Sequence, residues 1–214
     1  MQASDRLSLW RDLLREAGPE AVAEVGVWRG DFAAAILDAC PTIQRYYMID
    51  PWRPLERWAK PLNVSTAEFE ESLACALRVT EAHAEKRVVL RGTTKEQVGE
   101  IPDESLDFIY IDGDHTLRGI TIDLLLMWPK LKQAGILGGD DFTVTPWQHA
   151  EQFEPTLVSP FAVYFAEAVD APLRALAHSQ FLIEKRSGFV FEDTLDPHPL
   201  ELREVVRPPS GHLE

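Results

Sequence analysis

The sequence has few cysteines, no surplus of basic residues and no long apolar run. Its two cysteines, Cys40 and Cys75, are too few for a disulfide framework and lack metal-ligand spacing. The formal net charge of -14 leaves no basic surplus to displace counterions from a phosphate backbone, so we expect neither nucleic acid nor membrane as a partner. No apolar run approaches the roughly 18 residues that cross a bilayer, and the first residues lack the features of a secretion signal. We therefore expect a cytoplasmic protein.

The sequence does contain enough apolar material for a full core. Hydrophobic residues make up 45% of the 214 residues, which fits one domain of ordinary size. We expect a single domain over residues 1–195, of which residues 1–18 form an N-terminal amphipathic helix. Residues 196–214 are rich in proline and polar side chains, and we expect them to form a C-terminal tail.

Hydrophobic periodicity predicts an alternation of strands and helices. The expected strands are 21–27, 45–50, 88–92, 106–112, 135–141, 179–185 and 188–193, and the expected helices are 5–17, 30–40, 65–83, 117–131 and 160–169. Strands separated by helices form right-handed crossovers, which give an α/β fold with a mostly parallel sheet and helices on both faces. The short gap before Gly188 predicts that the last two strands form a C-terminal antiparallel hairpin in a seven-stranded sheet.

Four acids stand at or just after the ends of predicted strands, namely Asp50, Asp112, Asp140 and Asp141. In a parallel sheet these strand ends meet at one edge, where such folds bind their ligands. A buried carboxylate is costly unless it is paired, hydrogen-bonded or bound to a metal. The four acids are therefore either parts of one site or solvated turn residues.

The stretch EVGVWRGDFA, residues 24–33, combines a strand end, a glycine turn and a helix start. Gly26 and Gly30 allow a tight turn and a close approach of backbone to ligand. Their G-x-x-x-G spacing differs from the G-x-G-x-x-G of dinucleotide folds. Glu24 would repel a phosphate and suits a cationic ligand, whereas Asp50, twenty residues after Gly30, can hold ribose hydroxyls. The combination indicates an adenosine with a positively charged tail.

At these residues the chain resembles the class I S-adenosylmethionine-dependent methyltransferases. Glu24-Val-Gly26-Val-Trp-Arg-Gly30 is similar to their first motif, E/D-x-G-x-G-x-G, with Trp28 in place of the middle glycine. The resemblance covers about residues 20–193 and implies a Rossmann-like class I methyltransferase fold. It also implies S-adenosylmethionine as cofactor, bound by Glu24, Gly26, Gly30, Asp50, Thr94 and Asp112.

The acids after the fourth and fifth predicted strands suggest a cation. Three carboxylates within a few ångströms repel one another unless a cation lies among them, and hard oxygen ligands suit Mg²⁺. The pattern is similar to the metal-dependent O-methyltransferases of the catechol and caffeoyl-CoA type and the macrolide-sugar type. That resemblance implies a divalent metal on Asp112, Asp140 and Asp141, and His115 as the base that deprotonates a small-molecule hydroxyl. It also implies a possible homodimer.

Two other functions fit parts of the sequence. Residues 108–116 match the h-h-h-h-D-x-D-x-T pattern of haloacid-dehalogenase-like phosphohydrolases, with Asp112 as nucleophile and Asp114 as acid/base. However, three predicted strands precede this motif, whereas that nucleophile follows the first core strand. A non-catalytic cofactor-binding domain on the same fold is the third possibility.

Several of these polar residues also have simpler structural interpretations. His115 could cap the following helix or pair with Asp114, and Asp114 itself could hold a loop. Trp52 is expected to anchor the loop over 51–64, and His149 is expected at the surface.

Overall fold

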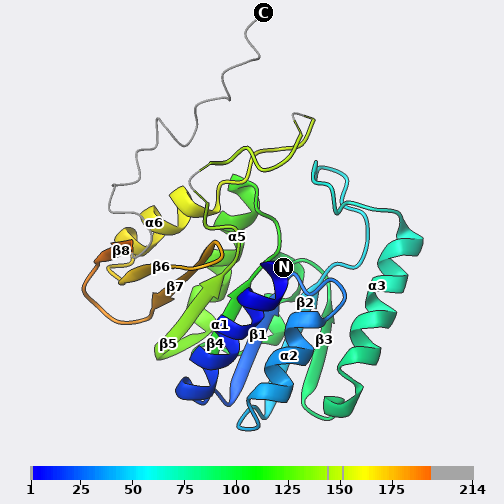
Figure 1. Cartoon of the computed structure of the whole chain (residues 1–214), viewed down its shortest axis with the longest axis horizontal. Coiled ribbons are helices and arrows are strands. Elements are labelled where there is room, and N and C mark those ends of the chain that lie inside the picture. Colours follow the sequence, from blue (N-terminus) through cyan, green and yellow to red (C-terminus); the bar gives the residue numbers. More distant parts are fainter. Residues whose placement is uncertain (1, 144, 151, 194–214) are drawn as a thin grey trace, which may run out of the picture.

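The computed structural model describes residues 2–143, 145–150 and 152–193 and is built on one sheet (Figure 1). Its eight strands run in the order β3-β2-β1-β4-β5-β7-β6-β8. The strands are β1 (Ala21–Val25), β2 (Arg45–Asp50), β3 (Arg87–Arg91), β4 (Leu106–Ile111), β5 (Leu131–Gly139), β6 (Leu173–Leu176), β7 (Gln180–Glu184) and β8 (Phe191–Asp193). β1 to β5 pair in parallel, which places their carboxyl ends at one edge. The α/β, Rossmann-like fold class is confirmed.

Helices cover both faces of the sheet. They are α1 (Gln2–Ala17), α2 (Asp31–Ala39), α3 (Thr66–Val79), α4 (Thr94–Gln97), α5 (Leu117–Met127) and α6 (Val158–Ala168), with 3₁₀ turns η1 (Glu81–His83), η2 (Val98–Glu100) and η3 (Trp128–Lys130). Buried side chains of α1, α2 and α3 pack on one face of the sheet, and those of α5 and α6 pack on the other. Successive strand residues alternate between the faces, so Val22 joins one core and Ala23 the other.

The helix boundaries follow from local sequence signals. Ser65 and Glu68 form the reciprocal capping box that starts α3, as the sequence predicts. Thr116 caps α5 by accepting a hydrogen bond from the Gly119 amide. Pro129 follows α5 within η3, where the chain leaves the helix. None of the helices in the described residues has the length and apolarity needed to cross a membrane.

The C-terminal edge of the sheet differs from the prediction. β7 forms its antiparallel hairpin with β6, while β8 pairs with β6 in parallel and does not contact β7 as a strand. The predicted hairpin between 179–185 and 188–193 is therefore wrong, and the sheet has eight strands in place of seven. The hairpin was missed because its turn contains no glycine. His178 and Ser179 adopt the positive φ angles themselves, 62° and 58°.

Two smaller boundaries also change. Leu131 begins β5, although its spacing from Leu124 and Met127 predicts a helical residue. The short helix α4 lies in a segment for which no element is predicted. The loop over 51–64 contains no helix or strand, as expected. The predicted tail over 196–214 lies outside the described residues.

Candidate functional site

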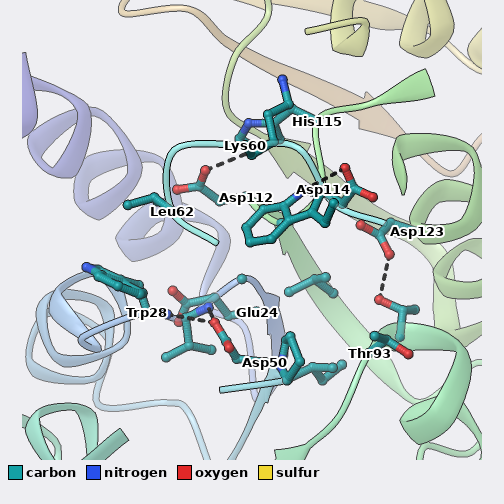
Figure 2. Close-up of a pocket in the computed structure, with 18 of the residues that line it drawn as sticks. Glu24, Trp28, Asp50, Lys60, Leu62, Thr93, Asp112, Asp114, His115 and Asp123 are labelled. Atoms are coloured by element: carbon teal, nitrogen blue, oxygen red, sulfur yellow. Dashed lines mark hydrogen bonds and ion pairs between the residues drawn. The ribbon is translucent and has the colours of Figure 1, made fainter. Parts of the chain in front are cut away.

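A cavity of about 440 Å³ opens at the carboxyl ends of β1, β2 and β4 (Figure 2). Glu24, Trp28 and Asp50 lie at one end of it, and Asp112, His115 and Lys60 at the other. The predicted site residues that line it are Glu24, Gly26, Asp50, Thr94, Asp112, His115 and Asp141. Gly30 and Asp140 are not among its lining residues. The strand ends thus bring most of the predicted site residues together.

The glycine turn after β1 requires both of its glycines. Gly26 has a φ of 85°, and a Cβ there would lie 2.0 Å from the carbonyl oxygen of Asp112. Gly30 has a φ of 82°, and a Cβ there would lie 2.8 Å from the Cα of Ala76 in α3. Gly26 therefore lets β1 approach the end of β4, and Gly30 lets α2 start against α3. Gly30 acts through packing and has no place on the cavity wall.

Asp50 fixes the conformation of the same turn. Its carboxylate accepts hydrogen bonds from the backbone amides of Val27, Trp28 and Trp52, at 3.0, 2.9 and 2.8 Å. Burial raises the pKa of Asp50, and these three amides oppose that shift. Trp52 is fully buried and donates its indole N–H to the carbonyl of Trp28, which is the anchoring role expected for it. A carboxylate has about four acceptor sites, so Asp50 retains capacity for a ligand hydroxyl.

Glu24 is a buried carboxyl group with one protein partner. It is 1% exposed and accepts a hydrogen bond of 2.7 Å from the hydroxyl of Tyr46. Burial raises the pKa of Glu24 well above its usual range, and the nearby Asp112 and Asp50 raise it further. A cationic group entering the cavity would favour the ionised form of Glu24.

The predicted Thr94 lies beside an acid that sequence reasoning missed. The Thr94 hydroxyl donates a hydrogen bond of 2.6 Å to Asp123 of α5, and both residues line the cavity. Burial raises the pKa of Asp123 to about 7, against the effect of the Thr94 hydrogen bond. Asp123 interrupts the apolar face formed by Ile120, Leu124 and Met127, and that interruption was the available signal.

At the opposite end, Asp112 lies between two cationic side chains. Arg6 of α1 donates a hydrogen bond of 2.9 Å from Nη1 to one Asp112 oxygen. The Nε2 of His115 lies 3.4 Å from the other oxygen, too poorly placed to form a hydrogen bond. Arg6 was not predicted as a site residue. The sequence feature that could have indicated Arg6 is its position four residues before Trp10, which puts a charged residue on the buried face of an amphipathic helix.

The two adjacent aspartates after β5 point to different partners. Asp140 contacts Nη1 of Arg6, accepts a hydrogen bond of 2.5 Å from the side-chain amide of Gln180, and caps the amide of Asp141. Asp141 has a φ of 60° and lies 2.5 Å from Nδ1 of His115. The left-handed turn at Asp141 thus directs one carboxylate toward α1 and β7 and the other toward the cavity.

His115 is held as a cation by these carboxylates. Burial disfavours its charge, but Asp112 and Asp141 raise the pKa of His115 to about 10. Burial likewise opposes the charge of Asp141, and His115 lowers the pKa of that carboxyl. For Arg6, burial is again the opposing effect, while Tyr110, Asp112 and Asp140 raise the pKa. Arg6 and His115 are therefore both positively charged at neutral pH.

The predicted metal ligands do not fit a divalent ion in this arrangement. Carboxylate oxygens are suitable ligands for Mg²⁺, but Arg6 holds Asp112 and Asp140, and His115 holds Asp141. Asp140 is also not among the residues that line the cavity. Within the described ranges, no three His, Cys, Asp or Glu side chains are arranged to hold a metal ion.

Two loops form the outer wall at this end. The indole of Trp58 donates a hydrogen bond of 3.0 Å to Asp114, which also accepts one from the amide of Thr116. Asp114 therefore has the structural role considered for it. Lys60 is buried at 6% exposure and donates to the hydroxyl of Thr156, and burial lowers its pKa. His149 is exposed, as the sequence predicts, and it also lines the cavity.

Comparisons with known proteins identify the family and the fold of the chain. A family model described as a methyltransferase domain matches residues 23–142. None of the curated proteins matches the chain. Among solved structures, a putative caffeoyl-CoA O-methyltransferase from Staphylococcus aureus is similar at 14% identity, covering 85% of this chain and 83% of its own, with a TM-score of 0.63.

Two further structures were solved with ligands. The O-methyltransferase TomG from Streptomyces achromogenes, involved in tomaymycin synthesis and in complex with SAM, is 16% identical over 86% of this chain and 80% of its own, with a TM-score of 0.59. An O-methyltransferase from Bacillus cereus in complex with SAH is 14% identical over 85% and 81%, with a TM-score of 0.60. At these identities the likeness shows the shared fold.

Proposed function

Because the chain belongs to the methyltransferase domain family, we propose that it transfers the methyl group of S-adenosylmethionine to a hydroxyl group of a small molecule. The observation that carries the proposal is the single cavity at the strand ends. Its Glu24 and Asp50 end suits a cationic nucleoside, and its Asp112 and His115 end suits a hydroxyl acceptor. Two structural neighbours are O-methyltransferases and a third is described as a putative one, which supports the choice of oxygen as acceptor atom.

The residues at the first end fit the cofactor. Gly26 lines the cavity, and its lack of a Cβ lets the turn pack against the end of β4. Asp50 retains acceptor sites for ribose hydroxyls. Glu24 offers an oxygen to the charged amino-acid portion, and Thr94 with Asp123 supplies hydrogen-bonding groups at another part of the wall. When bound, S-adenosylmethionine supplies an electrophilic methyl group. The chain mainly positions the two reactants.

At the second end the side chains would bind the acceptor and handle its proton. Trp58 and Leu62 provide apolar surface, and Lys60 and His149 provide polar groups. We propose that His115 receives the hydroxyl proton. Its imidazole must first lose the proton that Asp112 and Asp141 stabilise, so turnover should increase with pH toward the pKa of about 10.

Calorimetric titration with S-adenosylmethionine and S-adenosylhomocysteine tests the cofactor assignment. Binding of both is expected, and an Asp50→Ala variant should bind both at least tenfold more weakly. Methyl transfer from labelled S-adenosylmethionine to catechol, used as a probe acceptor, tests the proposed transfer to a hydroxyl group. His115→Ala should lose turnover and retain cofactor affinity. Failure of the folded wild type to bind either nucleoside would reject the proposal.

The alternatives predict different results. A phosphohydrolase would need Asp114 as acid/base, but this carboxylate is engaged by Trp58 and the Thr116 amide. We therefore expect no hydrolysis of p-nitrophenyl phosphate. A non-catalytic domain would bind the cofactor and transfer no methyl group to any hydroxylated probe.

A further inference from the structure

Helix α1 is fixed against the sheet near the acceptor end of the cavity. Trp10 is 1% exposed and contacts the rings of Phe108 and Tyr110, with centroids 5.2 and 5.4 Å away. Its indole donates a hydrogen bond of 2.7 Å to Gln180, whose amide donates in turn to Asp140. Arg6 lies one helical turn before Trp10 on the same face. The position of its guanidinium is thus set by a packed helix.

The guanidinium of Arg6 is the cation that Asp112 and Asp140 share. Nη1 contacts Asp112 and Asp140, and the other oxygen of Asp112 is adjacent to His115, which holds Asp141. A divalent ion bound to Asp112 and Asp140 would have to displace this guanidinium. It would leave a half-buried arginine without its anionic partners, which is unfavourable.

We propose that Arg6 is the resident cation of the acceptor subsite and takes the place of a divalent metal ion, so that this methyltransferase binds no metal there. The inference rests on the function proposed above. It rests on the contacts of Arg6 with Asp112 and Asp140, and on Asp140 not being among the residues that line the cavity.

Arg6 also has donors left for an acceptor. The Arg6 side chain is 26% exposed, and it lines the cavity. A guanidinium has five N–H donors and keeps its charge at all physiological pH values. Such a group can stabilise a developing alkoxide or phenolate. It would thereby supply the electrostatic stabilisation that a metal ion supplies in other enzymes.

Manganese binding provides the direct test. Mn²⁺ is titrated into the wild-type protein saturated with S-adenosylhomocysteine, and free Mn²⁺ is measured by electron paramagnetic resonance. The expected result is a free-ion signal equal to that of buffer alone at equimolar ion and protein. Stoichiometric binding of Mn²⁺ by the wild type would overturn the proposal.

Variants at Arg6 separate its charge from its packing. Arg6→Met keeps the apolar part of the side chain and removes the charge, so Mn²⁺ should bind at least tenfold more tightly than in the wild type. Arg6→Lys keeps a positive charge and should bind no Mn²⁺. Arg15→Ala removes a cation from the same helix at an exposed position and should match the wild type.

Circular dichroism establishes that each variant is folded before the titration. A folded Arg6→Met that gains no Mn²⁺ affinity would show that the guanidinium does not occupy an ion's place. The result is separable from the proposed function, because Mn²⁺ binding is measured without methyl transfer. If the protein binds no nucleoside, the methyltransferase proposal is rejected. The Mn²⁺ affinities of the wild type and Arg6→Met can still be compared without nucleoside, so the proposal about Arg6 is tested separately.

Discussion

The side chains that line the cavity differ in how many hydrogen bonds they already make within the ligand-free protein. Asp50 accepts three backbone amides and holds the glycine turn, so its loss affects both structure and binding. Glu24 has one described hydrogen bond, from Tyr46, and burial raises its pKa, so the ligand-free fold disfavours its ionised form. Glu24 is therefore the better residue for testing electrostatic recognition of a cationic ligand.

Glu24→Gln removes the charge and keeps an oxygen that can accept from Tyr46. We expect S-adenosylmethionine to bind at least tenfold more weakly, about 1.4 kcal/mol, because the amide cannot neutralise a cation. The melting temperature should not fall, since a buried ionisable group is removed. Calorimetry and thermal unfolding measure both effects. Glu20→Gln, at an exposed position, is the matched control; unchanged affinity in Glu24→Gln would contradict the assigned role.

Asp123→Asn should stabilise the protein in a pH-dependent manner. Burial raises the pKa of Asp123 to about 7 from 3.8. A raised carboxyl pKa means that the folded state holds the proton more tightly, so wild-type stability falls as the pH rises from about 4 to 7. Asparagine avoids this cost and can still accept from Thr94. The gain should be small at pH 4 and on the order of 1–3 kcal/mol at pH 8.

Chemical denaturation of both proteins at the two pH values measures this difference. The same gain at pH 4 and pH 8 would mean that Asp123 does not titrate as described. Asp103→Asn, which changes an exposed acid, controls for the overall change in net charge.

Among the elements, α1 depends on a glycine in β5. A Cβ on Gly138 would lie 2.2 Å from Cη2 of Trp10, so α1 can pack on β5 only because position 138 has no side chain. Gly138→Ala should move α1 outward and destabilise the fold by about 1–3 kcal/mol, as overpacking typically does. Because Arg6 is on the same face, its contact with Asp112 should weaken as well.

Thermal and chemical unfolding measure the stability change. Gly99→Ala is the matched control, because a Cβ there meets no atom within 4 Å, and we expect its effect to stay within about 0.5 kcal/mol. Equal stabilities of the two variants would mean that Trp10 does not pack on Gly138 in solution.

Elements were predictable where the local pattern was strong. The strands that carry Asp50 and Asp112 end as predicted to within a residue, because an apolar run followed by an acid marks the boundary. The strand Leu173–Leu176 was missed, since four residues with one charge give little periodicity. Its turn uses His178 and Ser179 at positive φ, for which sequence gives no reliable signal.

For the whole molecule, the predictable residues of the site are those that directly follow a strand in the sequence. The glycine turn, Asp112 and His115 all follow strands, and parallel pairing brings them together. Arg6, Lys60 and Asp123 enter from a distant helix, a loop and the next crossover, and only the tertiary structure shows that they line the cavity. No local pattern places Arg6 among the acids of the expected metal site, so its contacts with Asp112 and Asp140 could not be predicted either.

Cofactor binding should stabilise the entire domain, because residues of β1, β2, α4 and α5 share the cavity wall. At about a hundred times its Kd, S-adenosylhomocysteine should raise the unfolding free energy by roughly 2.7 kcal/mol. For a domain of this size the melting temperature should rise by roughly 5–10 °C. Calorimetric scans should show one transition that shifts as a unit. Two transitions, of which one is unaffected by ligand, would contradict the single domain expected over 1–195.

The contacts that hold α1 and Arg6 at the acceptor end join segments that are far apart in the chain. Arg6 and Asp140 are separated by 134 positions, and Trp10 and Gln180 by 170. A molecule whose first helix has detached would therefore leave Asp112 and Asp140 without Arg6, and these two acids would bind calcium or magnesium from the solvent. Trace metal in a purified sample would then report damaged molecules, and a chelating wash would be a means of quality control.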